Sequence, residues 1–192
     1  MVDPHFAMLW HEAIPRHAFA DAAGRATQVV TYAGTLEGGT SPPPPPPHSW
    51  AAAPENGVAV WTIKLDAKAQ WELPAAAKDL TRTLYLHRGV WALIGGQRVP
   101  GDSAVRVRSD AAISLEAGDE ETELLLLQGR PIGEPVAQMG PFVMNEHHQI
   151  GEAIMDYRRG TFGSWPWPSQ DPVHARERGR FAVHADGREE LK

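Results

Sequence analysis

Glycine and proline recur along the chain and divide it into short pieces. The 192 residues include 18 Gly and 17 Pro. Both residue types are typical of turns, glycine because it adopts positive φ and proline because its ring fixes φ. This spacing disfavours a helical bundle and favours many short strands joined by turns.

Alternation of apolar and polar side chains locates the strands. In residues 58–66, Trp61, Ile63 and Leu65 fall on one face, which predicts a half-buried strand. Residues 84–87 and 90–94 flank Arg88-Gly89 and are predicted to pair as a hairpin. Four consecutive leucines, 124–127, predict a strand covered on both faces. With further strands at 27–33, 105–108 and 112–115, the pattern predicts a β-sandwich, jelly roll or small barrel.

One segment has helical periodicity. Between residues 145 and 159, the apolar side chains Ile150, Ala153, Ile154 and Tyr157 recur at spacings of three and four. Asn145 is the expected N-cap, and Gly160 follows the last turn. Residues 169–192 are polar and charged with few large apolar side chains, which predicts a disordered tail.

Six consecutive prolines, residues 42–47, form a low-complexity run between two predicted strands. Such a run has no backbone N–H groups and favours an extended form. We interpret it as a stiff surface loop, and the alternative is a docking ligand for an aromatic groove.

Charge and composition exclude several classes of partner. The net charge is −6 and no basic cluster is visible, so a nucleic acid is not expected to bind directly. The absence of cysteine excludes thiolate metal sites and disulfides. The amino terminus lacks the pattern of a signal peptide, and no apolar run approaches the length of a membrane span. We therefore expect a cytoplasmic protein without a membrane partner.

Two motifs resemble the carboxyl-terminal half of pirin-family proteins. Gly-Arg-Pro-Ile-Gly-Glu-Pro-Val at 129–136 precedes Gly-Pro-Phe-Val-Met-Asn at 140–145, and the predicted helix ends in Asp-Tyr-Arg-Arg-Gly at 156–160. The likeness extends over residues 29–163. It implies an all-β fold, a cupin or RmlC-like double-stranded β-helix (jelly-roll barrel) with one C-terminal helix, which is the second of two tandem barrels in this family.

The resemblance also implies a division of the chain. Residues 1–28 would join a preceding cupin barrel, and Pro4-His5-Phe6 resembles the element that follows the first barrel in the family. Residues 29–136 would form the pirin C-terminal cupin domain. Residues 137–168 would form the GPFVMN segment, the helix and a return arm, and residues 169–192 the tail. The chain is thus expected to represent the carboxyl-terminal half only.

The resemblance implies iron in the family's other barrel, bound by histidines of a His-x-His motif and a glutamate. The nine histidines here include no His-x-His pair. His147 and His148 are neighbours on a predicted helix, where they point about 100° apart and do not face each other. We therefore expect no metal site and no cofactor in this chain.

Three hypotheses follow for function. The first is a metal-free half with a binding role, whose partner is a metal-bearing cupin barrel, a second copy of itself or another protein. Its expected interface residues are Trp10, Phe142, Met144, Ile154, Trp165 and Trp167. The second, implied by the resemblance, is an iron-dependent enzyme of the quercetin 2,3-dioxygenase type, if the metal-bearing barrel is supplied or ligands such as His48 and His87 converge from distant positions. The third is a small-molecule-binding barrel with a cavity lined by Arg82, Tyr85, His87 and Trp91.

Overall fold

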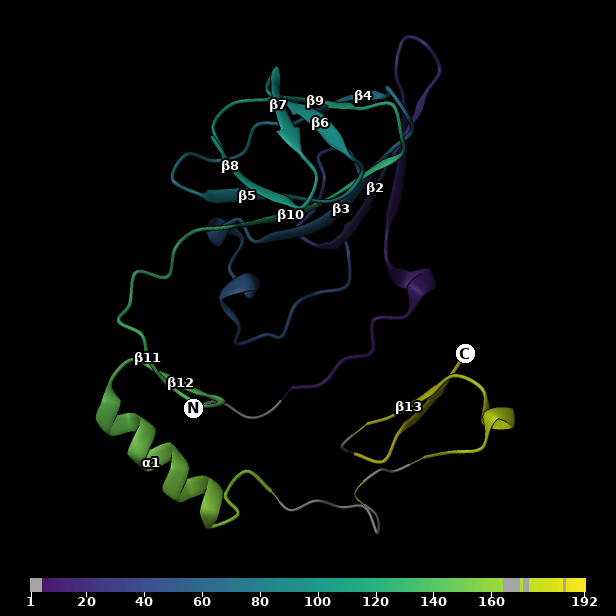
Figure 1. The fold of residues 1–192 in the computed structure, drawn as a ribbon. Coiled ribbons are helices and arrows are strands. Elements are labelled where there is room, and N and C mark those ends of the chain that lie inside the picture. Colours follow the sequence, from purple (N-terminus) through teal and green to yellow (C-terminus); the bar gives the residue numbers. More distant parts are fainter. Residues whose placement is uncertain (1–4, 164–169, 171–172, 185) are drawn as a thin grey trace. The chain divides into compact units, whose positions relative to one another are not determined.

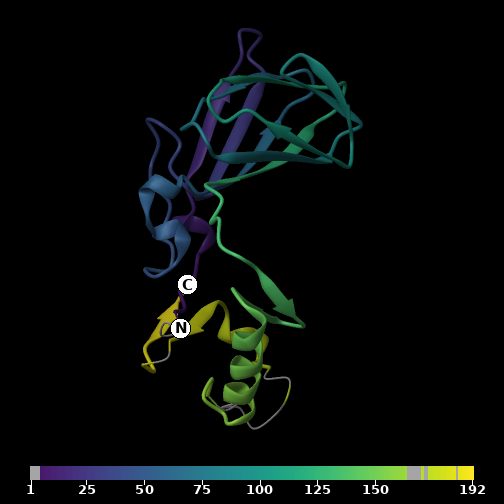
Figure 2. The ribbon, with the colours of Figure 1, turned by 90° about the vertical axis from the view of Figure 1, so that its left-hand side faces the viewer.

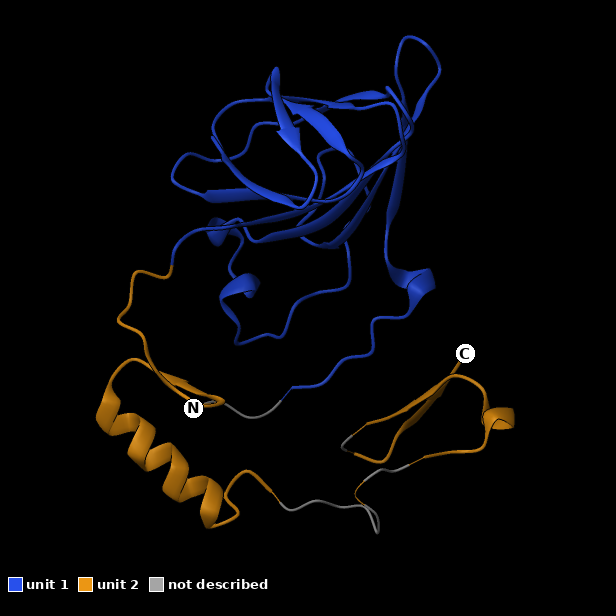
Figure 3. Cartoon of the chain, in the orientation of Figure 1, with its two compact units in different colours: residues 1–131 blue, residues 132–192 orange. Residues whose placement is uncertain are grey.

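The computed structural model describes residues 5–163, 170, 173–184 and 186–192. The chain divides into two compact units, residues 1–131 and 132–192 (Figure 3). Each unit is described here by itself.

Unit 1 consists of two antiparallel sheets that enclose a common core (Figure 1). The larger sheet has the order β1-β2-β3-β10-β5-β8, and the smaller has the order β4-β9-β6-β7. The bounds are β1 (Arg16–Ala20), β2 (Ala26–Ala33), β3 (Ala59–Leu65), β4 (Gln70–Leu73), β5 (Thr81–Arg88), β6 (Trp91–Ile94), β7 (Gln97–Pro100), β8 (Ser103–Val107), β9 (Ile113–Ala117) and β10 (Thr122–Gly129). This arrangement confirms the predicted cupin jelly roll.

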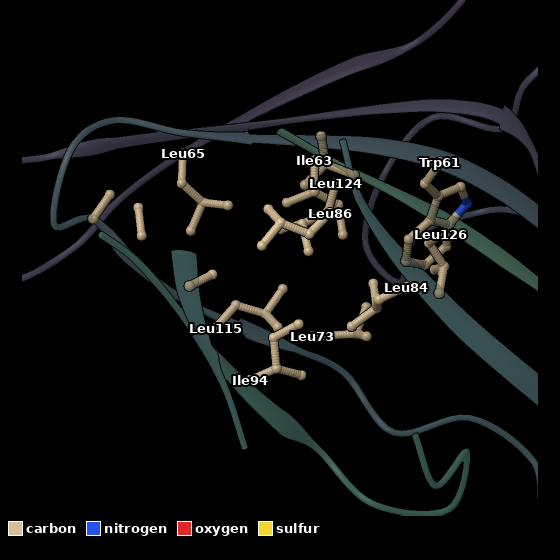
Figure 4. Close-up of a cluster of buried hydrophobic side chains, with 14 of the residues drawn as sticks. Trp61, Ile63, Leu65, Leu73, Leu84, Leu86, Ile94, Leu115, Leu124 and Leu126 are labelled. Carbon is tan, nitrogen blue, oxygen red and sulfur yellow. The ribbon is translucent and has the colours of Figure 1, made fainter. Parts of the chain in front are cut away.

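The core lies between the inner faces of the two sheets. In β3 every second side chain is buried, so the predicted face of Trp61, Ile63 and Leu65 is confirmed. Figure 4 shows these side chains together with leucines of β5 and β10 from the larger sheet, and with Leu115 and Ile94 from the smaller one. The apolar residues that alternate along the sequence therefore pack together in an aliphatic interior.

The predicted hairpin of residues 84–87 and 90–94 is wrong. β5 pairs with β10 and β8 in the larger sheet, whereas β6 pairs with β7 and β9 in the smaller one. Gly89, with φ of +104°, lies where the chain passes from one sheet to the other. The hairpin at this point is instead β6–β7, which turns through Gly95 and Gly96 at positive φ. Local spacing did not distinguish a turn within a sheet from a corner between sheets.

The four leucines are covered on one face only, contrary to the prediction. β10 is central in its sheet, between β3 and β5. Leu124 and Leu126 are buried in the core, but Leu125 is half-buried and Leu127 is 37% exposed on the outer face. The outer face of β10 therefore carries Leu125 and Leu127 beside the charged Glu123.

A long connection joins β2 to β3 and contains the proline run together with two short 3-10 turns, η2 (Trp50–Ala52) and η3 (Pro54–Asn56). Residues 41–46 belong to no helix or strand, so the run forms a loop as predicted. Figure 2 shows β2 and β3 side by side, with η2 and η3 beyond one end of these strands. A further short turn, η1 (His11–Ala13), precedes β1.

Unit 2 contains a two-stranded ribbon, a helix and a hairpin. The ribbon pairs β11 (Ala137–Met139) with β12 (Phe142–Met144), and α1 (His147–Arg158) follows it. Glu146, not Asn145, is the N-cap, because its backbone N–H donates to Gln149 Oε1 at 2.9 Å in a capping box. Asn145 instead donates to Glu134 Oε2 at 2.6 Å.

The tail differs from the disorder predicted for residues 169–192. Within its described part, η4 (Arg176–Arg178) precedes β13 (Phe181–Val183), which pairs with β14 (Glu189–Leu191). Arg178 contacts the ring of Phe181 and forms an ion pair with Glu189. None of the helices among the described residues has the length and apolar character that a membrane crossing requires.

Candidate functional site: a pocket beside the barrel

The interior of the barrel is mainly aliphatic, with side chains that include Ile63, Leu84, Leu86, Leu115 and Leu126. Over the described residues, no three His, Asp or Glu side chains gather closely enough to hold a metal ion. Iron needs converging nitrogen and oxygen ligands, so the residues present inside this barrel do not fit it.

The four residues predicted to line a cavity do not form one site. Arg82 faces the interior and is 1% exposed, whereas Tyr85 and His87 lie on the outer face of the same strand. Trp91 is half-buried in the other sheet, with the guanidinium of Arg98 4.4 Å from its ring centre. Residues 82, 85 and 87 fall on opposite faces because side chains alternate along a strand.

Arg82 instead closes one end of the barrel through neutral partners. Its Nε donates to Gln128 Oε1 at 2.6 Å, and its Nη1 donates to the carbonyl of Pro74 at 2.8 Å. Burial lowers the pKa of the Arg82 guanidinium, yet arginine stays charged under ordinary conditions. In the described part of the chain, no carboxylate forms an ion pair with it. A buried cation is therefore held by an amide and a carbonyl.

We did not select Gln128 from the sequence, although it accepts a hydrogen bond from the buried Arg82 and lies at the edge of the barrel. It lies opposite Arg82 in the β5–β10 ladder, so both side chains are on the inner face. Its Nε2 donates to the carbonyl of Gly57 at 2.9 Å. In the sequence, Gln128 directly follows four leucines, and this polar residue at the end of an apolar strand could have indicated a buried polar contact.

Gln128 also lines a pocket of about 390 Å³ at this end of the barrel. Residues 42–45 of the proline run form part of its wall, together with Ala51–Pro54, Gly57–Ala59 and Ala33–Thr35. Gly34 is required there, since it has φ of +74° and an added Cβ would lie 2.5 Å from the carbonyl oxygen of Val58. The volume lies in the range of small-molecule sites.

Glu123 lies in β10, and Asp119, Glu120 and Glu121 precede this strand where the chain passes from one sheet to the other. β9 and β10, which flank them, belong to different sheets. Glu121 and Glu123 form ion pairs with Lys64 and Arg88, at N–O distances between 2.8 and 3.8 Å. These carboxylates neutralise neighbouring bases on the outer face.

The predicted interface residues are distributed over both units. Trp10 is only 8% exposed, which leaves little of its ring for a partner. Phe142, Met144 and Ile154 of unit 2 are half-buried. Trp165 and Trp167 lie outside the described residues. The two adjacent histidines are exposed at the start of α1, and His148 Nδ1 lies 3.4 Å from Glu146 Oε2.

Unit 2 exposes apolar side chains that were not singled out as interface residues. Tyr157 is 64% exposed and lies between Phe142 and Phe162, with ring centres 6.0 and 6.1 Å away. Val143 and Met155 are 56% and 48% exposed. The sequence placed Tyr157 on the buried helical face with Ile150 and Ala153, but only the latter two are buried. We name Phe142, which is one of the predicted interface residues, and its ring neighbours Tyr157 and Phe162 the aromatic patch.

Comparison with known proteins identifies the family. Residues 60–163 match the model of the pirin C-terminal cupin domain. The chain belongs to the pirin family. This match covers more than half of the residues and confirms the resemblance noted in the sequence.

Individual relatives extend the match. A Pseudomonas aeruginosa protein named "Putative quercetin 2,3-dioxygenase" is 30% identical over 84% of this chain and 52% of its own length. Mouse pirin is 40% identical over 37% of this chain and 26% of its own length. The crystal structure of a quercetin 2,3-dioxygenase from Acinetobacter baumannii aligns with 80% of this chain and 49% of that one, at 30% identity and a TM-score of 0.63. The chain thus spans about half the length of the P. aeruginosa protein and of the A. baumannii enzyme.

Proposed function

We propose that this chain is the interaction half of a pirin-type protein, which contributes a packed cupin scaffold and docks a metal-bearing cupin barrel. The observation that carries this proposal is the aromatic patch of unit 2. Large apolar side chains gathered on one surface mark interaction sites, and aromatic rings are typical anchors there.

The small core of unit 2 supports the same proposal. Its buried apolar residues are few among those described and include Ala137, Ile150 and Ala153. A two-stranded ribbon with one helix buries too little apolar surface to be stable on its own. A partner that covers the exposed rings of Tyr157 and Phe162 would supply the missing burial.

We choose a cupin barrel as the partner because the chain matches only about half the length of its P. aeruginosa relative. The P. aeruginosa relative is about twice as long as the matched region, and the matched region corresponds to the C-terminal cupin domain of the family model. The remaining half of such a relative is the natural candidate for the surface that covers the patch. A second copy of this chain and an unrelated protein are the competing partners.

Sedimentation velocity tests the proposal. The full chain is mixed with the segment of the P. aeruginosa relative that it does not match, and we expect a one-to-one complex. Tyr157→Ser should weaken this complex at least about tenfold, which corresponds to about 1.4 kcal/mol. Glu152→Ser, a change at an exposed polar position on the same helix, is the matched control.

Two results would contradict the docking role. The first is a chain that remains monomeric and does not bind the segment at about 100 µM, since a specific interface binds more tightly than this. The second is equal affinity for the Tyr157→Ser and Glu152→Ser variants. Self-association alone, sensitive to Tyr157→Ser, would replace the cupin barrel with a second copy as the partner.

The names of the relatives favour a second candidate function, a quercetin 2,3-dioxygenase completed by another barrel. This barrel does not offer ligands for iron, so the proposed metal would be held by the other half, and this chain would contribute binding surface only. Metal analysis and quercetin turnover, measured on the chain alone and in the mixture, test this candidate. Turnover with stoichiometric metal in the chain alone would refute the assignment of iron to the other half.

A further inference from the structure

The pocket beside the barrel has the character of a small-molecule site. None of the described residues that line it carries a charge, and most are proline, alanine or glycine. Proline side chains have no rotamers to lose, and the close approach at Gly34 fixes the opposite wall. The pocket is therefore preformed and suits an uncharged, mostly apolar molecule.

The polar groups of the pocket are few, and most bond to one another. Thr35 Oγ1 donates to Ser41 Oγ at 3.1 Å. The carbonyls of Ala33 and Gly34 accept from Trp61 Nε1 at 3.1 and 3.0 Å. The two carbonyls are already paired, whereas the Ser41 hydroxyl accepts from Thr35 and keeps its own hydrogen.

Gln128 differs from these groups because its amide has a hydrogen to spare and its oxygen is held by the buried Arg82. Arg82 only donates, so the atom of Gln128 that faces it must be the oxygen. The amide nitrogen then carries two hydrogens, of which one bonds to the carbonyl of Gly57. The second has no partner among the residues that the structure describes.

Arg82 strengthens this spare donor. A hydrogen bond from a buried guanidinium to the amide oxygen draws electron density from the amide nitrogen, which makes its N–H a better donor. Arg82 is 1% exposed and has no carboxylate partner in the described chain, so its positive charge is uncompensated. The potential at the Gln128 end of the pocket therefore favours an electron-rich oxygen.

We propose that this pocket binds an uncharged and mostly apolar small molecule that bears one carbonyl oxygen, which accepts a hydrogen bond from Gln128. The proline run and Ala51–Ala53 would contact the apolar part of this molecule. Arg82 acts as a positioning residue, since it holds the Gln128 amide in one orientation. This site is independent of the aromatic patch and of any metal.

A matched pair of compounds tests the carbonyl. The probe is 1-indanone, a flat bicyclic ketone, and its partner is indane, which has the same ring system without the oxygen. NMR titration of the full chain should shift the Gln128 side-chain amide and the backbone amides of Ala51 and Ala53, with 1-indanone binding in about the millimolar range expected for so small a molecule. Indane should bind about fivefold more weakly, the factor that one neutral hydrogen bond supplies.

Two variants separate recognition from folding. Gln128→Glu retains an oxygen for Arg82 but removes both amide hydrogens, so the preference for the ketone should disappear. Its melting temperature should stay within about 3 °C of the wild type, because the ion pair gained with Arg82 offsets the lost bond to Gly57. Ala53→Phe places a ring in the pocket, leaves the chemistry of Arg82 and Gln128 unchanged and should abolish binding of both compounds.

The proposal is overturned by any of three results. One is the absence of shifts at the lining residues up to the solubility limit of 1-indanone. Another is equal affinity of the wild type for 1-indanone and indane. The third is a preference for the ketone that persists in a folded Gln128→Glu variant.

Discussion

Leu126 and Leu127 provide a direct test of whether the barrel is packed or hollow. They are adjacent in β10, yet Leu126 is 0% exposed in the core and Leu127 is 37% exposed on the outer face. Truncation of a leucine to alanine in a close-packed core costs about 2–5 kcal/mol, through lost transfer energy and the cavity left behind. We expect Leu126→Ala to lower the free energy of unfolding by about 3 kcal/mol.

Leu127→Ala is the matched control, with the same atoms removed one residue away. Because this side chain retains much of its exposure to water, we expect a loss below about 1 kcal/mol. Urea unfolding followed by fluorescence gives both values, provided that the slope with denaturant is unchanged. A cost for Leu126→Ala no greater than that for Leu127→Ala would refute a filled interior and indicate a cavity large enough for a ligand inside the barrel.

Three further changes have expected outcomes. Gly34→Ala should destabilise unit 1 by about 1–3 kcal/mol in urea unfolding, because its φ is +74° and the new Cβ would meet the carbonyl of Val58. Gln149→Ala should reduce helicity measured by circular dichroism and cost about 1 kcal/mol, because it removes one half of the capping box at α1; unchanged helicity would count against this cap. Burial raises the pKa of Asp21, but hydrogen bonds from Arg25, Gln70 and Ala23 outweigh it and lower the pKa below 3.8. The ionised form is thus favoured by folding, so its stabilisation is present above about pH 4 and is lost as the pH falls through the folded-state pKa. Asp21→Asn should reduce the loss of unfolding free energy at acid pH. An unchanged pH dependence would contradict a stabilising role of the Asp21 carboxylate.

The sequence predicted the strands better than their pairing. The alternation of apolar and polar residues at 58–66 predicted which side chains are buried. The structure confirmed this prediction because successive side chains of a strand point to opposite faces. Pairing depends on which sheet each strand joins, and this is decided by contacts far apart in the chain. The segments at 84–88 and 91–94 are separated by a glycine corner that local spacing cannot tell from a hairpin turn.

The candidate site was less predictable than the fold. The pocket is formed by the proline run, Gln128 of β10 and the turn at Gly34. Gln128 is far from the other two segments in the sequence, and all three come together only in the folded chain. Arg82 was chosen from the sequence for a cavity with Tyr85 and His87, although strand alternation places it on the opposite face from both. Its partner Gln128 is more than forty residues away along the chain, and no motif connects the two.

The proline run has a practical consequence for anyone who studies ligands of this protein. Residues 42–47 have no amide hydrogens, so hydrogen exchange and amide-detected spectra contain no signal from this wall of the pocket. A compound seated against these rings would go unnoticed unless the proline carbons are labelled or the opposite wall is observed. The same lack of donors prevents this long loop from adding as a strand to a neighbouring sheet edge, so it can remain exposed without promoting aggregation.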